Sequence, residues 1–300
     1  MKNDRVAAVV VTYNRLPLLQ KCIEKLEAQT APCDILVVNN ASSDGSTEWL
    51  EARQGGRLLS KNTGANLGGA GGFNCGMRWA VEAGYDHLWL MDDDCLPEPD
   101  ALEKLLEADA LLKGEYGWLS SVALWVDGSE CRMNRQKIRK SSNEYIPLMK
   151  YGIVQAEQAT FVSLFLSANT VLRVGLPIKE FFIWGDDIEY TRRIAVRECL
   201  PGFVVGRSRV VHAMKENGGS NIATDRAERI DRYRYAFRNE AYTYRQEGAW
   251  GVCYYLAKCG FSFCRILAKA PDRRGKRIGV LLGSMIRGAV FRPKIEKTDI

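Results

Sequence analysis

Residues 88–100 of the chain read Leu-Trp-Leu-Met-Asp-Asp-Asp-Cys-Leu-Pro-Glu-Pro-Asp, an apolar run that meets three adjacent carboxylates. The run predicts a buried strand over His87–Met91 that ends at the acidic triplet Asp92–Asp94. Neighbouring like charges raise one another's pKa unless a cation or strong donors lie among them. We therefore expect a metal ion at the end of this strand, with a solvated acidic loop as the alternative.

Short apolar segments alternate with amphipathic segments around this strand. We expect strands at residues 6–12, 34–38, 57–59 and 87–91, and helices at residues 17–28, 47–52, 73–83 and 101–112. A strand at residues 118–126, a polar surface loop at residues 127–157, and a strand-like segment at residues 159–174 follow. This order is typical of right-handed crossovers and predicts an α/β fold with a mainly parallel sheet flanked by helices.

Polar side chains directly follow three of the expected strands. They are Thr12 and Asn14, the segment Asn39–Asp44, and the triplet Asp92–Asp94. In mainly parallel sheets, ligands bind beyond the carboxyl ends of the strands. The three groups are therefore predicted to meet at one ligand-binding edge of the sheet.

The positive charge of the chain is concentrated near its C-terminus. The net charge is +6, and residues 250–300 carry eleven Lys and Arg against three Asp and Glu, which leaves about −2 on the rest. We expect a ligand-binding domain at residues 1–222 and a helical basic appendage at residues 223–300. Alternating apolar and cationic residues are typical of a helix on an anionic membrane surface. A solvated helix face and a homo-oligomer contact are the alternatives.

Other sequence features exclude several classes of protein. Nine scattered cysteines without a C-x-x-C pair favour a reducing compartment over a disulfide framework or a zinc site. The N-terminus lacks a signal-peptide cleavage site, and no apolar stretch reaches the ~18 residues of a membrane span. An acidic ligand site disfavours nucleic acid. We expect a cytoplasmic protein, peripheral on the inner face of the membrane if its basic segment binds lipid.

Two acidic groups have patterns that suit metal binding and general-base catalysis. Asp92 and Asp94 alternate along an extended turn, so their carboxylates can share one hard cation, which can carry the charge of a diphosphate leaving group. His212 ends another apolar run and is a candidate third ligand, with a structural role as the alternative. Asp186 and Asp187 follow an aromatic run, where partial burial suits a general base and a helix cap is equally compatible.

Two further features are less specific. The segment Asn62–Asn74 is rich in glycine but contains neither the dinucleotide fingerprint nor a P-loop. Its glycines permit close backbone approach to a ligand, and the next helix offers its positive N-terminus to phosphate, while a flexible turn is the alternative. Trp184 offers an aromatic platform for a sugar ring, with a core position as the alternative.

Five motifs resemble, in order, those of glycosyltransferase family 2. They are Val9–Arg15 (VVVTYNR), Val37–Gly45 (VVNNASSDG), Asn66–Asn74 (NLGGAGGFN), Asp92–Asp94 (DDD) and Trp184–Arg193 (WGDDIEYTRR). The resemblance covers roughly residues 5–245 and is nearest to bacterial galactofuranosyltransferases, with rhamnosyltransferases close behind. It implies a GT-A fold and an inverting, metal-dependent enzyme that uses a nucleotide-diphosphate sugar.

The resemblance also implies a set of nucleotide-binding residues. Thr12 and Tyr13 match the motif that contacts the base and the ribose. The second-strand acid that usually pairs with uracil is replaced by Asn39, which is a departure from the family pattern. The implied nucleotide contacts are Thr12, Tyr13, Asn14, Asn39, Asn40, Asp44 and Asn66.

Roles in the reaction follow from the resemblance in the same way. Asp92 and Asp94 would hold Mn²⁺ or Mg²⁺ on the diphosphate, and the family's downstream histidine falls at His212. Asp187 would be the catalytic base. Asp93, Trp184 and Asp186 are the implied sugar or acceptor contacts.

The function implied is transfer of galactofuranose from UDP-galactofuranose to a glycan or lipid-linked acceptor in cell-surface polysaccharide synthesis. Rhamnosyl transfer from dTDP-rhamnose is the alternative. A sugar nucleotidyltransferase is disfavoured, because such enzymes place a Gly-rich loop with Arg and Lys where this chain has Thr12–Pro17. A non-catalytic nucleotide-sugar-binding protein would leave Asp187 and the aspartate triplet without a joint purpose.

Overall fold

The computed structural model describes residues 4–139 and 143–298. Residues 1–3, 140–142 and 299–300, and with them the outer ends of both expected domains, lie outside the described residues. The strands are β1 (Val6–Thr12), β2 (Asp34–Asn39), β3 (Leu58–Asn62), β4 (His87–Asp92), β5 (Cys95–Pro97), β6 (Trp118–Leu124), β7 (Lys137–Ile138), β8 (Ile153–Gln158), β9 (Leu164–Ser167) and β10 (Gly202–His212). The α-helices are α1 (Leu16–Glu27), α2 (Ser46–Arg53), α3 (Gly68–Glu82), α4 (Ala101–Leu112), α5 (Ala168–Val174), α6 (Asp186–Arg192), α7 (Tyr233–Arg245), α8 (Gly248–Lys269) and α9 (Arg274–Val290).

The strands form one mixed sheet in the order β3-β2-β1-β4-β9-β6-β10-β8-β7, and β5 pairs with β10. β3, β2, β1 and β4 are parallel, as are β6 and β10. β9 runs antiparallel between β4 and β6, and β8 runs antiparallel to β10. The expected α/β fold with a mainly parallel sheet is confirmed.

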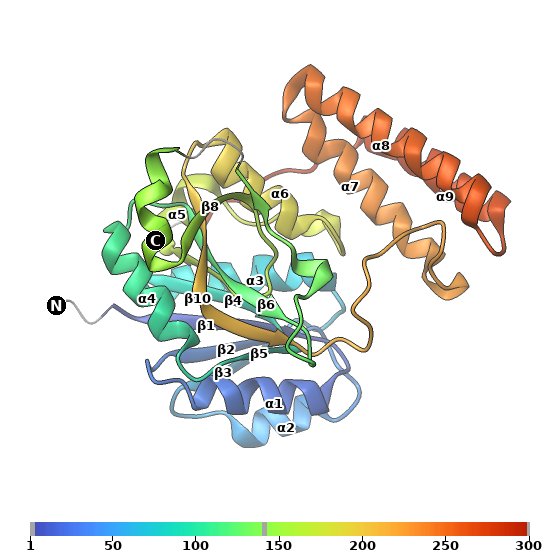
Figure 1. The fold of residues 1–300 in the computed structure, drawn as a ribbon. Coiled ribbons are helices and arrows are strands. Elements are labelled where there is room, and N and C mark those ends of the chain that lie inside the picture. The colour runs from blue at the N-terminus through green and yellow to red at the C-terminus, as the bar shows by residue number, and fades with distance from the viewer. Residues whose placement is uncertain (1–3, 140–142, 299–300) are drawn as a thin grey trace.

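Helices cover both faces of the sheet (Figure 1). Alternate residues of β1 separate the two cores, because successive side chains of a strand point to opposite faces. Ala8 and Val10 pack with Leu19 of α1 on one face. Val9 packs with Phe73 of α3 on the other face. Burial on both sides explains why β1 is a continuous apolar run without polar alternation.

Four segments differ from the sequence expectations. Of the segment at residues 159–174, expected to be strand-like, only β9 is a strand, and Ala168–Val174 is helix α5. The polar segment at residues 127–157 is not all loop, because it contains β7, a 3₁₀ helix at Asn143–Tyr151 and the start of β8. β8 was missed because its polar Gln155 is buried beside β10. The helix expected from residue 73 begins at Gly68, so its first turns are the glycine-rich segment. The helical appendage expected from residue 223 starts as a 3₁₀ helix at Ala227–Arg232 and becomes α7 at Tyr233.

The last three helices form an arm beside the sheet-bearing part (Figure 1). They share an apolar cluster that includes Phe237, Tyr255 and Leu281. The segment after α9 returns to the sheet-bearing part, where Leu176 N donates to Glu296 O at 2.8 Å. No helix among the described residues combines the length and the apolarity needed to cross a bilayer.

Candidate active site

The strand ends bring the acidic triplet and His212 together. β1 and β4 are parallel neighbours with Val11 opposite Asp92, so Thr12 lies beside the start of the triplet. The short strand β5 then reverses against β10 and places Cys95 opposite His212. This pairing explains why two segments 118 residues apart meet, with His212 Nε2 at 3.1 Å from Asp94 Oδ1.

Arg15 and Thr12 hold two members of the triplet. Arg15 Nη1 lies 2.6 Å from Asp94 Oδ2 and 3.2 Å from Asp93 Oδ1. The Thr12 hydroxyl donates to Asp93 Oδ2 at 2.7 Å. Asp93 therefore faces the end of β1. Arg15 is not among the site residues expected from the sequence, although its position in the short segment between β1 and α1 is an available signal.

The three carboxylates have different electrostatic surroundings. Burial, reinforced by the charge of Asp94, raises the pKa of Asp92 to about 7. Burial raises the pKa of Asp93 to about 6, although Arg15 and Thr12 favour its anion. Burial acts in the same sense on Asp94, but His212 and Arg15 outweigh it and lower the Asp94 pKa. Asp92 is thus the carboxylate with the strongest need of an added cation.

Asn134 fixes the orientation of His212. The Asn134 Oδ1 lies 2.7 Å from His212 Nδ1, and the Asn134 amide donates to Thr160 Oγ1 at 2.8 Å. Because the amide oxygen can only accept, Nδ1 carries the proton and Nε2 faces Asp94. Burial disfavours the imidazolium, but the hydrogen bond and charge of Asp94 outweigh burial and raise the pKa of His212 to about 10.

The donor set suits Mn²⁺ or Mg²⁺ by its chemistry. Two carboxylates and an imidazole held by a second residue are ligands that Mn²⁺ accepts. The Asp92 carboxylate receives no hydrogen bond from the described residues, and its raised pKa reports unbalanced negative charge. Within residues 4–139 and 143–298, no three acidic, thiol or imidazole groups already surround one point at metal distance. In this arrangement Arg15 contacts Asp93 and Asp94, and Nε2 of the His212 imidazolium contacts Asp94, while the Asp92 carboxylate has no such partner in the part of the chain that the structure describes.

The second acidic pair lies at the start of α6. The helix is capped by Gly185 with φ 86°, so the expectation that Asp186 caps it is wrong. Burial and the charge of Asp187 raise the pKa of Asp186 well above its ordinary range, and the charge of Asp92 adds to the rise. Burial alone raises the pKa of Asp187 to about 6, against a hydrogen bond from Ile188 N at 2.7 Å. The charge of Asp92 acts on Asp186, so the triplet and the α6 pair lie close enough to interact electrostatically.

A strained turn delivers this acidic pair to the site. Phe182 has φ 64° and ψ −61°, and Trp184 has φ 63°. For residues other than glycine such backbone angles cost about 1–3 kcal/mol each and persist only where surrounding contacts impose them. Trp184 lies with its ring centroid 5.0 Å from that of Tyr233, so the expected sugar platform is half-buried against the helical arm.

The side chains expected to contact the nucleotide divide into two groups. Asn39 is buried and hydrogen-bonds the loop after β2, donating to Thr47 Oγ1 at 2.8 Å and accepting from Ser42 N at 3.0 Å. Asn40 is also buried and donates to Gly68 O at 3.0 Å. In this structure both amides therefore brace the loops around the site.

Asp44 and Asn14 brace the same region. Asp44 accepts from Leu16 N at 2.8 Å and from Ser46 Oγ at 2.6 Å. Its pKa is lowered, because these hydrogen bonds outweigh desolvation. Asn14 Oδ1 accepts from Ser43 N at 2.7 Å. The second group comprises Tyr13, which is 44% exposed, and Asn66, whose oxygen accepts from Gly68 N at 2.9 Å while the residue remains exposed.

The glycine-rich segment is a packing device. A Cβ on Gly72 would lie 2.4 Å from Val11 Cγ1, so glycine allows α3 to pack directly against β1. Gly68 has φ +71°, and a Cβ there would lie 2.0 Å from Phe182 O. Two residues after Gly68, Ala70 N donates to the same Phe182 oxygen at 3.2 Å. This segment therefore lies against the strained turn that precedes Asp186.

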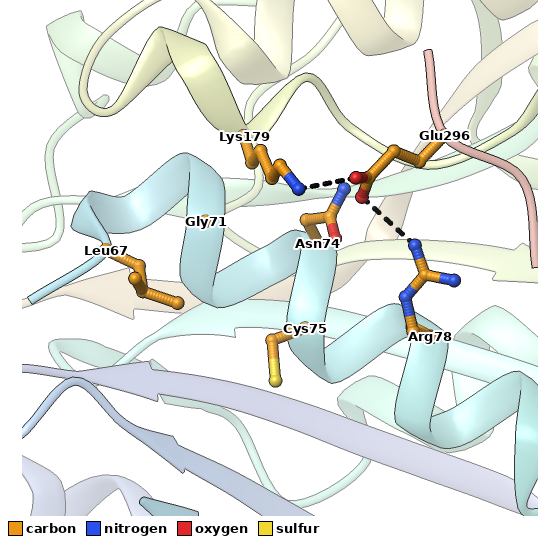
Figure 2. A pocket seen from close by; sticks show the side chains of 7 residues that line it. All are labelled: Leu67, Gly71, Asn74, Cys75, Arg78, Lys179 and Glu296. Atoms are coloured by element: carbon orange, nitrogen blue, oxygen red, sulfur yellow. Dashed lines mark hydrogen bonds and ion pairs between the residues drawn. The ribbon is translucent and has the colours of Figure 1, made fainter. Parts of the chain in front are cut away.

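The opposite face of α3 lines a cavity of about 380 Å³ (Figure 2). Its wall includes Leu67 and Cys75, and Glu296 crosses it between Lys179 and Arg78. None of the acidic strand-end residues lines this cavity. It marks the place where the segment after α9 packs on α3 and lies apart from the candidate active site.

The architecture is that of the GT-A glycosyltransferases. The chain superposes on a Pyrobaculum calidifontis mannosyltransferase solved with GDP-mannose and Mn²⁺, with TM-score 0.54 and 16% identity over 95% of this chain and 86% of that one. It superposes on GalNAc-T7, solved with UDP, GalNAc and Mn²⁺, with TM-score 0.58 and 12% identity over 86% of this chain and 55% of that one. At these identities the likeness concerns the fold.

Sequence comparison gives the family. Residues 7–112 match Glycosyl transferase family 2. The galactofuranosyltransferase GlfT1 of Mycobacterium tuberculosis is 32% identical over 212 residues, which are 66% of this chain and 66% of that protein. An undecaprenyl-phosphate mannosyltransferase of Micrococcus luteus is 37% identical over 108 residues, 35% of this chain and 44% of that protein. The chain spans about two thirds of the length of GlfT1 and less than half of that of the mannosyltransferase. It belongs to glycosyltransferase family 2.

Proposed function

We propose that this chain is a metal-dependent, inverting glycosyltransferase that moves galactofuranose from UDP-galactofuranose to a glycan or lipid-linked acceptor in cell-surface polysaccharide synthesis. The observation that carries the proposal is the contact of Asp94 with His212 at the strand ends, beside Asp92, whose charge acts on Asp186 of the α6 pair. The sugar is supported by the similarity to GlfT1, and a lipid-linked acceptor by the similarity to the undecaprenyl-phosphate mannosyltransferase. Rhamnosyl transfer from dTDP-rhamnose is the second candidate, because Asn39 replaces the acid that usually pairs with uracil.

The chemistry of the proposed reaction is divided among few residues. A divalent cation held by Asp92, Asp94 and His212 would supply positive charge to the diphosphate leaving group. Asp187 would accept the proton of the acceptor hydroxyl as that oxygen attacks the anomeric carbon from the face opposite the diphosphate. One displacement at this carbon inverts its configuration.

The two acids of the pair suit different protonation states. A pKa of about 6 leaves Asp187 ionised at neutral pH and still basic enough to take a proton. Asp186 is held neutral by burial and by its charged neighbour, so it can donate a hydrogen bond to a sugar or acceptor oxygen. Opposite protonation states in adjacent carboxyl groups are typical of acid–base sites.

A thermal-shift screen tests donor and metal together. The protein is heated with UDP-galactofuranose, dTDP-rhamnose or GDP-mannose, each with and without Mn²⁺. We expect UDP-galactofuranose with Mn²⁺ to raise the unfolding temperature of the wild type by a few degrees, because ligand binding to the folded state stabilises it. Asp94→Ala should lose this shift. A shift that is the same without Mn²⁺ would contradict the metal role.

We also propose that residues 1–222 form the catalytic domain and that the helical part, residues 223–300, rests on an anionic membrane. Large apolar side chains of α8 and α9 are exposed, including Trp250 at 87% and Ile286 at 71%. Residues 248–290 carry eight Lys and Arg against one Asp, a net charge of +7. Apolar side chains beside cations are complementary to an anionic lipid surface.

The same charge argues against self-association through this face. A two-fold interface places identical patches against each other, so two copies of a segment of charge +7 would repel. Exposed cations lie at the start of α9, at Arg273, Arg274 and Lys276, the last of which is paired with Asp231. A membrane contact would hold the protein near a lipid-linked acceptor.

A further inference from the structure

The strained turn before the acidic pair has its carbonyl groups held from two sides. On one side Ala70 N, in the first turn of α3, donates to Phe182 O at 3.2 Å. On the other side the Asn239 amide nitrogen, on α7, lies 3.0 Å from Phe181 O, 3.3 Å from Ile183 O and 2.7 Å from Trp184 O. All four carbonyl oxygens from Phe181 to Trp184 are therefore engaged by groups outside the turn.

The chemistry around Asn239 allows one orientation of its amide. Three carbonyl oxygens surround the nitrogen and can only accept hydrogen bonds. The Asn239 oxygen accepts from Arg238 Nε at 3.0 Å and Nη2 at 2.8 Å, and a guanidinium can only donate. The side chain is fully buried, so water cannot replace these contacts.

Arg238 adds further hydrogen bonds to the turn. Its Nη2 also donates to Glu180 O at 2.6 Å and to Phe181 O at 3.3 Å. Its guanidinium lies 4.2 Å from the ring centroid of Phe291, the first residue after α9. The α7 pair thus joins the turn to the C-terminal helices.

We propose that Asn239, with Arg238, is a positioning residue that holds the Phe181–Trp184 turn in its strained form and so sets the place of Asp187. This inference rests on the proposed role of Asp187 as the base. Backbone angles such as those of Phe182 and Trp184 are imposed by surrounding contacts. When the amide is lost, the turn relaxes and carries the start of α6 with it.

Two substitutions at Asn239 separate shape from hydrogen bonding. Asn239→Asp keeps the shape of the side chain but places a carboxylate oxygen against the three carbonyl oxygens of the turn. Asn239→Ala removes the amide group. A misplacement of about 1 Å at a reacting group can cost 10²-fold in rate, so we expect kcat to fall about 100-fold in both. The KM for UDP-galactofuranose and the Kd for UDP with Mn²⁺ should stay within about threefold of wild type, because the donor is expected at the strand ends.

Thr243→Val is the matched control on the same helix. Thr243 is buried one turn further along α7, and its hydroxyl donates only to Asn239 O at 3.1 Å within the helix. We expect this variant to lose stability without a change in kcat. Arg238→Met keeps an unbranched apolar chain and removes the donors, so we expect kcat to fall by about tenfold. This variant tests the inference if neither Asn239 variant folds.

Amide hydrogen exchange of residues 181–190 gives a readout that does not depend on activity. We expect faster exchange there in the Asn239 variants, with protection of the sheet unchanged. If the wild type does not transfer galactofuranose, the proposed function fails. The exchange result still tests whether Asn239 holds the Phe181–Trp184 turn. Three results would overturn the inference. The first is unchanged exchange at residues 181–190, and the second is an unchanged kcat. The third is an equal loss of kcat and donor binding, with faster exchange over the whole protein.

Discussion

At the scale of single residues, the site depends on carboxylates with unequal affinities for protons. Asp94 is paired with His212 and Arg15, and its pKa is lowered. Asp92, Asp93, Asp186 and Asp187 are all shifted upward by burial. The chain thus keeps several carboxyl groups near their titration points, which is characteristic of functional sites.

The Asp187 pKa gives the sign of the pH dependence. A base must be deprotonated to act, and burial raises the pKa of Asp187 from an ordinary value near 4 to about 6. The transfer rate at saturating donor and Mn²⁺ should therefore rise as pH increases from about 5 to about 7, with a midpoint near 6, and level off above it. Thermal unfolding over the same pH range shows whether the acidic limb is loss of folded protein instead. A rate that rises toward acid pH would contradict the role of Asp187.

At the scale of elements, α8 and α9 expose large apolar side chains to solvent. The α8 face away from the rest of the protein exposes large apolar side chains from Trp250 to Leu267. Its buried face, through Tyr255 and Cys259, packs in the cluster shared with α7. A two-sided apolar helix needs a second apolar neighbour, which the proposed membrane contact would supply.

Vesicle sedimentation tests this contact. We expect wild-type protein to sediment with phosphatidylglycerol-rich vesicles, to sediment weakly with pure phosphatidylcholine, and to be released by salt. Trp250→Glu combined with Phe261→Glu should weaken binding at least about tenfold, because two charges enter the apolar face. Val126→Glu is the control, since Val126 is 57% exposed on the sheet-bearing part.

Two results would contradict the membrane contact. One is unchanged vesicle binding in the double variant. The other is a wild-type dimer in solution, measured by light scattering, that the double variant converts to monomers while vesicle binding stays the same. The second result would assign the exposed face to contact between copies of the chain.

At the scale of the whole molecule, the pattern of apolar runs was sufficient to predict the parallel half of the sheet and the edge where its polar strand ends lie. β1 and β4 are continuous apolar runs with polar residues at their carboxyl ends, so their placement follows from local sequence. The comparisons confirm the family and the fold that the motifs implied. The proximity of His212 and Asp94 also follows the expectation.

What the sequence did not predict depends on contacts between distant segments. Asn134 orients His212 from a segment expected to be a surface loop, and no local pattern marks it. Asn239 lies 55 residues from Trp184 in a helix rich in Arg and Tyr, so its contact with the turn is set by the packing of α7. Arg15 had a local signal, whereas these two asparagines required the tertiary structure.

The measurement that tests the central claim most directly is sugar transfer by Asp187→Asn beside Asp186→Asn. The account predicts that Asp187→Asn lowers the transfer rate by about 10²- to 10⁴-fold, the contribution of a general base, while the Kd for UDP with Mn²⁺ stays within about twofold. Asp186→Asn should lose less, because a neutral amide replaces an acid that burial keeps neutral. Near-wild-type transfer by Asp187→Asn would contradict the account.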